Sequence, residues 1–168
     1  MLISDKQLVK KRFDLVATGG TFDQIHRGHL ALLSRAFELG NRVIIGVTSD
    51  DFVIKRKGKN KIKHNYAERV ATLKDTIRNN FGNVIYEITK LDNDYGPVVV
   101  SADVGALVAS AETAKKADEI NKIRYRNGLR EIEVITVDLV TAYDGKPISS
   151  SRIRNGEIDP FGNRLKLI

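Results

Sequence analysis

Hydrophobic and polar positions along the chain follow two periodicities, one typical of buried strands and one typical of amphipathic helices. Short apolar runs rich in β-branched residues predict strands at residues 13–18, 42–49, 84–91, 106–110 and 132–140. Apolar side chains three or four positions apart predict helices at residues 29–39, 65–79 and 112–126, and the stretch SSSRIRNG predicts a last short helix. Gly40 and the pair Asn127-Gly128 are typical of helix ends.

The segments between these elements are polar or ambiguous. Residues 55–63 are rich in lysine and predict a loop, and residues 92–97 predict a turn. Residues 97–105 fit a strand and a short helix equally well.

Strands that alternate with helices predict an α/β fold: a Rossmann-like, doubly wound, parallel five-stranded sheet with helices on both faces. The chain has 168 residues, with no internal repeat and no long linker, so we expect a single domain over residues 1–168. Ligands of such sheets bind beyond the carboxyl ends of the strands, where the strand order reverses. We therefore expect the chemistry just after the first, fourth and fifth strands.

The composition favours an anionic partner. Lysine and arginine total 28 against 21 acidic residues, a net charge of +7. This excess suits nucleic acid, phosphorylated metabolites or anionic lipid, and it suits equally a solvated lysine-rich surface. The chain has no cysteine, which excludes disulfides and thiolate chemistry. It has no apolar run near the ~20 residues of a membrane helix and no signal-peptide segment at its start, so we expect a cytoplasmic protein.

The stretch ATGGTFDQIHRGHLALL, residues 17–33, follows the first predicted strand. Gly19 and Gly20 permit a tight turn that brings backbone amides close to a ligand. A helix that begins near Gly28 directs free N–H groups and its positive dipole end to the same place, which favours a phosphate. The small Gly28 also leaves room for a nucleotide beside the backbone.

His26 and His29 lie three positions apart at this helix start, in a chain with 3 histidines. Both imidazoles can face one bound anion and donate N–H groups to phosphate oxygens as negative charge develops. Two other interpretations remain open: a metal site shared by the pair, although no neighbouring residue completes a ligand set, and a histidine that caps the helix.

The second candidate region is ISSSRIR, residues 148–154. Ser149, Ser150 and Ser151 present hydroxyls and amides at a helix start, where β- and γ-phosphates bind well. The alternative is a simple serine N-cap, which explains one serine but not three followed by Arg152 and Arg154.

Taken together, GGTFD followed by HRGH, and ISSSRIR about 120 residues later, resemble the signatures of the HIGH-motif nucleotidyltransferases, the cytidylyltransferase-like superfamily. ALVASAET, KKADEINKIR and the Tyr-x-x-Arg-Val helix start extend the resemblance to the archaeal and eukaryotic type of phosphopantetheine adenylyltransferase. The similarity runs from Phe13 to about Asp159. It departs at Ala109, where that family has valine.

The resemblance implies an enzyme of coenzyme A biosynthesis, a nucleotidyltransferase that transfers the adenylyl group of ATP to 4′-phosphopantetheine. Pyrophosphate and dephospho-coenzyme A are the products. Mg²⁺ is the expected cofactor, bound mainly through the ATP phosphates. Coenzyme A is a candidate inhibitor, and neither a membrane nor a nucleic acid is expected as a partner.

The resemblance also implies roles for individual residues. Catalysis is assigned to His29, Thr21 and Lys55. Nucleotide binding is assigned to Gly19, Gly20, Phe22, His26, Gly28, Ser110, Glu112, Arg124, Ile148, Ser149, Ser150, Ser151 and Arg152. Binding of the acceptor is assigned to Thr21, Lys55, Lys57 and Asn121, and no residue is assigned to a metal.

Plainer interpretations stay open for several of these residues. Thr21 fits a turn hydroxyl, and Ser110 with Glu112 fits an N-cap with a first-turn acid. Arg124 fits a surface arginine, and the lysines of residues 55–63 fit a solvated charge run. We expect Asp23 to fix its loop through hydrogen bonds to the backbone, because an attacking phosphate needs no general base.

Two rival functions also stay open. The first is an adenylyl- or cytidylyltransferase for another phosphorylated metabolite, such as nicotinamide mononucleotide, flavin mononucleotide or glycerol 3-phosphate. The second is a non-enzymatic RNA-binding module, which the positive charge suggests. The lysine-rich segment has no aromatic residue before Tyr66 on which bases could stack, and this disfavours the second rival.

Overall fold

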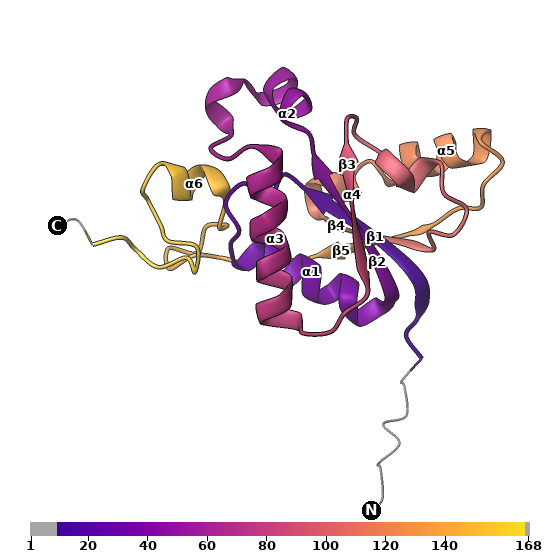
Figure 1. Ribbon diagram of the computed structural model, residues 1–168, viewed down its shortest axis with the longest axis horizontal. Coiled ribbons are helices and arrows are strands. Elements are labelled where there is room, and N and C mark those ends of the chain that lie inside the picture. Colours follow the sequence, from indigo (N-terminus) through magenta and orange to yellow (C-terminus); the bar gives the residue numbers. More distant parts are fainter. Residues whose placement is uncertain (1–9, 167–168) are drawn as a thin grey trace, which may run out of the picture.

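The computed structural model describes residues 10–166, which form a parallel sheet flanked by helices (Figure 1). The strands are β1 (Phe13–Gly20), β2 (Gly40–Thr48), β3 (Tyr86–Leu91), β4 (Ala106–Ser110) and β5 (Glu133–Val137). The α-helices are α1 (Arg27–Leu39), α2 (Asp50–Lys57), α3 (Tyr66–Phe81), α4 (Ala111–Ala114), α5 (Ala117–Arg126) and α6 (Ser150–Arg154), with short 3₁₀ turns η1 (Lys59–Lys61) and η2 (Gly96–Val99). None of the helices among residues 10–166 has the length and apolar character needed to span a membrane.

The sheet has the strand order β3-β2-β1-β4-β5, and every neighbouring pair is parallel. The chain builds β2 and β3 on one side of β1 and then crosses over to place β4 and β5 on the other. This arrangement confirms the doubly wound fold. The reversal occurs between β1 and β4, so the crevice for a ligand is expected at their carboxyl ends.

Alternating side chains of the central strand serve the two faces of the sheet. Val16 packs with Leu33 of α1 and Leu73 of α3 in one buried cluster. Its neighbour Ala17 packs with Ile120 of α5 in a second cluster on the opposite face. Figure 1 shows α1 and α3 together on one side of the sheet, with α5 on the other. Both faces are therefore covered, which explains the nearly continuous apolar runs of β1 and β2.

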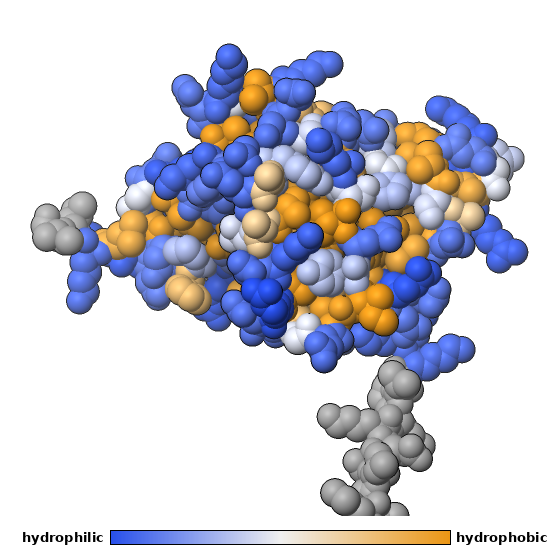
Figure 2. All heavy atoms as spheres, in the orientation of Figure 1, coloured by the Kyte–Doolittle hydropathy of each residue, from blue (hydrophilic) through white to orange (hydrophobic). Residues whose placement is uncertain are grey.

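The lysine-rich segment differs from the prediction. Residues 55–57 form the last turn of α2 and are not a loop. The Ser49 hydroxyl caps this helix by accepting a hydrogen bond from Phe52 N at 3.2 Å. Asp50 and Asp51 lie in the first turn and three basic residues in the last, which suits the helix dipole. Hydrophilic side chains dominate the outer surface of α2 in Figure 2.

Two further predictions need correction in detail. The single helix predicted at residues 112–126 is divided into α4 and α5 by a break at Lys115 and Lys116. The ambiguous segment after residue 97 is helical only in its first residues, where it completes η2. The predicted positions of all five strands are confirmed, although β5 ends at Val137 and not at residue 140.

Candidate active site

A cavity of about 390 Å³ opens at the carboxyl ends of β1 and β4, where the strand order reverses. Residues 18–21, the start of α1, the end of α2, the start of α4 and residues 137–140 contribute to its wall. Its polar side chains include Thr21, His26, His29, Arg56, Lys57, Ser110, Glu112 and Lys116. The volume falls within the ~300–1,000 Å³ typical of small-molecule sites.

The two histidines form the N-terminal cap of α1. His26 is the N-cap residue, and its Nδ1 accepts a hydrogen bond from Gly28 N at 3.1 Å. In return, Nδ1 of His29 accepts from His26 N at 3.2 Å. This reciprocal pair is a capping box built from two imidazoles. The capping interpretation is therefore confirmed, but it occupies only one nitrogen of each ring.

The same hydrogen bonds determine where each ring carries its proton. A ring nitrogen that accepts a hydrogen bond is unprotonated, so the neutral imidazole holds its hydrogen on Nε2. Burial lowers the pKa of His26 to about 4 and the pKa of His29 to about 3, and the neighbouring His26 contributes to the second shift. Both rings are therefore neutral at pH 7, and each has one N–H group, on Nε2, available for a ligand.

Gly28 has a structural reason to lack a side chain. A Cβ at this position would lie 2.8 Å from Cε1 of His26. The space that the sequence suggested for a nucleotide is thus filled by the His26 ring, which folds over the backbone of α1. The glycine between the histidines is what allows the capping box to close.

Phe22 does not present its side chain to the cavity. It is 1 % exposed and belongs to the core cluster beneath α1. Its ring centroid lies 5.1 Å from that of His29. The Phe22 side chain is therefore not placed to contact a nucleotide in the cavity; it is buried in the core, where its ring packs beside the His29 imidazole.

The residues just before Phe22 do face the cavity. Gly19, Gly20 and Thr21 line it at the end of β1. A Cβ on Gly19 would lie 2.9 Å from the carbonyl oxygen of Gly46 in β2, so only glycine fits there. The hydroxyl of Thr21 accepts a hydrogen bond from the hydroxyl of Thr48 at 3.1 Å.

The positive charge at the cavity comes only in part from the residues that the sequence suggested. Lys57 lines the cavity, but Lys55 does not; it is exposed on α2. Arg56 and Lys116 also line the wall, and both form ion pairs with Asp94, at 2.5 and 3.2 Å. Sequence reasoning missed these two cations. The helical signals around residues 49–57 would have placed Arg56 on the same short helix as Lys57.

Ser110 and Glu112 line the cavity where β4 passes into α4. The Ser110 hydroxyl is also the N-cap of this four-residue helix, at 3.5 Å from Thr113 N. Capping and access to the cavity are thus compatible for this serine. Glu112 occupies the first turn of α4 and is exposed.

Asn121 and Arg124, which the sequence assigned to acceptor and nucleotide binding, lie outside the cavity lining. Asn121 forms two hydrogen bonds with the backbone of Ile132, one as donor and one as acceptor. Arg124 is 1 % exposed and donates to the carbonyl oxygens of Arg130, Val98 and Ser101 at 2.8, 2.5 and 2.9 Å. Both side chains are engaged in hydrogen bonds that connect segments of the fold, so the structure does not bring them to the cavity.

The two motifs from opposite ends of the chain meet. The hydroxyl of Ser150 lies 3.4 Å from the carbonyl oxygen of Gln24, in the loop before α1. Arg27 N donates to the carbonyl oxygen of Pro160 at 3.1 Å. Ile148 lines the same cavity as His26 and His29. The C-terminal serine motif is therefore placed beside the histidine motif.

The other residues of the serine motif have distinct positions. Ser149 is the N-cap of α6 and accepts from Arg152 N at 3.3 Å. Arg152 forms ion pairs with Asp144 at 2.6 Å and Glu157 at 3.0 Å. The capping alternative is thus confirmed for Ser149, and the charge of Arg152 is already matched by two carboxylates.

Ser151 lines a second cavity, of about 610 Å³, between the lysine-rich segment and α6. Lys61, Lys63 and Arg154 lie in the same wall.

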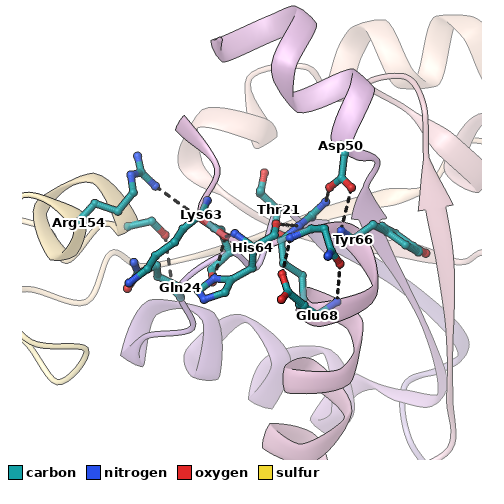
Figure 3. Close-up of polar contacts among 12 residues, drawn as sticks. Thr21, Gln24, Asp50, Lys63, His64, Tyr66, Glu68 and Arg154 are labelled. Carbon is teal, nitrogen blue, oxygen red and sulfur yellow. Dashed lines mark hydrogen bonds and ion pairs between the residues drawn. The ribbon is translucent and has the colours of Figure 1, made fainter. Parts of the chain in front are cut away.

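Asp23 fixes the loop between β1 and α1, as predicted. Its buried carboxylate accepts hydrogen bonds from Lys63 N and His64 N, both at 2.9 Å (Figure 3). Nη1 of Arg154 lies 3.9 Å from the same carboxylate. Among the residues that the structure describes, no group of three or more His, Asp or Glu side chains is arranged to hold a metal ion.

Residues 17–156 match the family model described as cytidylyltransferase-like. The chain is 44 % identical over 160 residues to a protein of Methanothermobacter thermautotrophicus named phosphopantetheine adenylyltransferase, which covers 95 % of this chain and 94 % of that protein. A protein of Pyrococcus abyssi with the same name is 44 % identical over 163 residues, covering 92 % and 98 % of the two chains.

Solved structures share the architecture. A protein of unknown function from Archaeoglobus fulgidus superposes with a TM-score of 0.67 at 35 % identity, over 80 % of this chain and 98 % of that one. A lipopolysaccharide core biosynthesis protein from Thermoplasma volcanium superposes with a TM-score of 0.61 over 75 % and 98 % of the two chains, but at 18 % identity it supports the fold alone.

Proposed function

This chain belongs to the cytidylyltransferase-like family, and from that premise we propose that it is an adenylyltransferase that converts ATP and 4′-phosphopantetheine into dephospho-coenzyme A and pyrophosphate. The observation that carries the proposal is the 44 % identity, over nearly the whole chain, to proteins named for this activity. The meeting of the histidine and serine motifs beside one cavity supports it.

In the proposed reaction an oxygen of the acceptor phosphate attacks the α-phosphorus of ATP. The bond from that phosphorus to the bridging oxygen breaks, and pyrophosphate leaves with the electron pair. No enzyme side chain has to form a covalent bond, so the protein contributes positioning and stabilisation of charge. The chain's neutral imidazoles and cations at the cavity fit both tasks.

His29 is proposed to donate its Nε2–H to an α-phosphate oxygen, and His26 to contact the nucleotide beside it. Their tautomer matters, because the helix cap keeps the single hydrogen of each neutral ring on Nε2, where it can be donated to a phosphate oxygen. Thr21 is proposed to contact the acceptor phosphate from the end of β1. Lys57 replaces Lys55 as the lysine that neutralises the phosphates, since Lys57 lines the cavity.

ATP is proposed to lie across the carboxyl ends of β1 and β4. The amides of Gly19 and Gly20, the Ser110 hydroxyl and the side chain of Ile148 are the groups that meet it there. The described residues contain no cluster of carboxylates that would hold a metal on its own. Mg²⁺ is therefore proposed to enter with ATP, held by the phosphates and water, where it neutralises part of their charge.

Other acceptors are not favoured, because curated relatives at 44 % identity are named for phosphopantetheine. We place the reaction in the cytoplasm, where ATP and Mg²⁺ are plentiful. Coenzyme A shares both the pantetheine and the adenylyl parts of the product, so it is proposed to compete for the same cavity.

The test is direct. Purified protein with ATP, Mg²⁺ and 4′-phosphopantetheine should release pyrophosphate and form dephospho-coenzyme A. Parallel reactions with nicotinamide mononucleotide, flavin mononucleotide and glycerol 3-phosphate should release far less. Faster turnover of one of these three acceptors would overturn the assignment of the substrate.

A further inference from the structure

Arg69 is a buried arginine that reaches the edge of the candidate active site. It lies in the first turns of α3, and its side chain is 0 % exposed. Nη1 donates to the carbonyl oxygen of Thr21, and Nη2 donates to that of Thr48, both at 2.7 Å. Nε donates to the carbonyl oxygen of His64 at 3.2 Å. One guanidinium therefore joins three separate segments of the chain, in the network drawn in Figure 3.

The carbonyl partners of Arg69 lie where the sheet stops. The pairing of β1 with β2 ends at Gly20 and Val47. Thr21 directly follows β1 and Thr48 is the last residue of β2, and their hydroxyls also bond to each other at 3.1 Å. Arg69 thus links two segments just beyond the last strand pair, where both Thr21 and Thr48 line the cavity.

The charge of Arg69 is balanced by Asp50 at the start of α2. Its Oδ1 accepts from Nη2 of Arg69 at 2.7 Å, and its Oδ2 accepts from Tyr66 N at 3.0 Å. Burial raises the pKa of Asp50, but the hydrogen bonds from Tyr66 and Arg69 outweigh this and leave the pKa below its usual value. Asp50 is therefore ionised at neutral pH and can remain paired with the arginine.

The loop after Thr21 is fixed by the same region of α3. His64, whose carbonyl oxygen accepts from Arg69, donates its own N–H to Asp23 at 2.9 Å. Thr21 and Asp23 are thus both attached to the residues that begin α3. These attachments fix the segment that leads into the histidine cap of α1.

The docking of α3 does not require a buried charge. Leu73 and Ile77 are 0 % exposed and pack α3 against the sheet in the main core cluster. Asn65 and Glu68 cap the helix with a reciprocal capping box. A buried guanidinium is costly unless all its partners are well placed, so an apolar residue would have been sufficient for docking alone. What arginine adds is a planar fork that binds several acceptors in fixed directions.

We propose that Arg69 is a positioning residue for adenylyl transfer, acting through the backbone of Thr21 and Thr48 to fix the acceptor-binding segment relative to the histidine pair. The proposal rests on the proposed function. A displacement of reacting groups by about 1 Å can slow catalysis by about 10²-fold. Lysine in place of arginine keeps the charge but cannot reach all three carbonyl oxygens.

The test compares Arg69→Lys with Leu73→Ala, a core variant one turn further along the same helix that leaves the Arg69 hydrogen bonds in place. Both should unfold at lower temperature than the wild type. At a temperature where all are folded, Arg69→Lys should lose about 10²-fold in kcat with little change in the KM for ATP. Leu73→Ala should keep the wild-type kcat. Equal kcat values for the two variants would overturn the proposal.

Hydrogen exchange supplies a measurement that does not depend on the reaction. Amides of residues 19–23 should exchange faster in Arg69→Lys than in Leu73→Ala, both without ligand. Unchanged protection in this segment would also overturn the proposal. If Arg69→Lys shows this faster exchange while the wild type proves inactive with every acceptor, the proposed function fails but the role of Arg69 in fixing the segment holds.

If Arg69→Lys does not fold, Arg69→Gln takes its place, because glutamine donates a hydrogen bond without burying an unpaired charge. The expected loss in kcat and the expected faster exchange are the same.

Discussion

Replacing His29 by alanine should have two separate effects, because it removes the cap hydrogen bond seen in the structure and the proposed hydrogen bond to the substrate. Nδ1 accepts from His26 N at 3.2 Å within the helix cap, and Nε2 is the nitrogen left to donate into the cavity. Loss of the first bond should lower the free energy of unfolding by about 1 kcal/mol, as for other helix caps. Loss of the second should remove about 2.7–4 kcal/mol of transition-state stabilisation, or 10²–10³-fold in kcat.

Urea denaturation measures the first effect and steady-state pyrophosphate release measures the second. Arg27→Ala is the matched control, because Arg27 lies in the same turn of α1, is exposed and does not line the cavity. This control should keep both stability and kcat. If His29→Ala has the kcat of the control at saturating substrates, the imidazole does not stabilise the transition state and the reasoning is refuted.

Three other predictions concern protons, the serine motif and the lysines. With pKa values of about 4 and 3, the folded forms of His26 and His29 bind fewer protons than the unfolded chain below about pH 6.5. The free energy of unfolding should therefore fall on acidification from pH 6.5 to about 4, and a variant lacking both imidazoles should show a flatter pH dependence in urea titrations. Ser150→Ala removes the hydroxyl that bonds to the loop before α1 and should raise the KM for ATP; an unchanged ATP dependence would leave this serine only a structural role. Lys57→Ala should lower kcat/KM by about tenfold or more, as for the loss of a charged contact, whereas Lys55→Ala should not, and the opposite ranking would restore the original assignment.

The fold could be predicted from the sequence because its central strands are apolar on both faces. Val16 and Ala17 serve opposite faces of the sheet, so β1 needs apolar residues at consecutive positions. A run of this kind bounded by glycine indicates a central parallel strand without further information. The short helix α2 was missed because its lysines were interpreted as a loop. Ser49 and the two aspartates after it are, however, ordinary signals of a helix start.

The candidate site could be predicted from the sequence only in part. The histidine and serine motifs were found from their residue types and from the resemblance to nucleotidyltransferase signatures, and the structure places Ser150 beside the loop that precedes His26. The roles of Arg69 and Arg124 could not be found in this way. Each is buried because carbonyl oxygens from distant segments surround it, and those carbonyl groups carry no signal in the amino-acid sequence. A charged residue in a helix pattern is by default interpreted as exposed.

The histidine capping box couples the local stability of α1 to the tautomer of its two imidazoles. When the first turn of α1 frays, the hydrogen bonds from His26 N to Nδ1 of His29 and from Gly28 N to Nδ1 of His26 break. Either nitrogen of each ring can then carry the proton. An imidazole released in this way exchanges between its two neutral tautomers, and only one of them directs a hydrogen toward the cavity. Under the proposed role of His29, the fraction of molecules able to react then depends on the opening equilibrium of a single helical turn. Substitutions far from any substrate can therefore lower activity by loosening that turn, without changing a residue that contacts the phosphates.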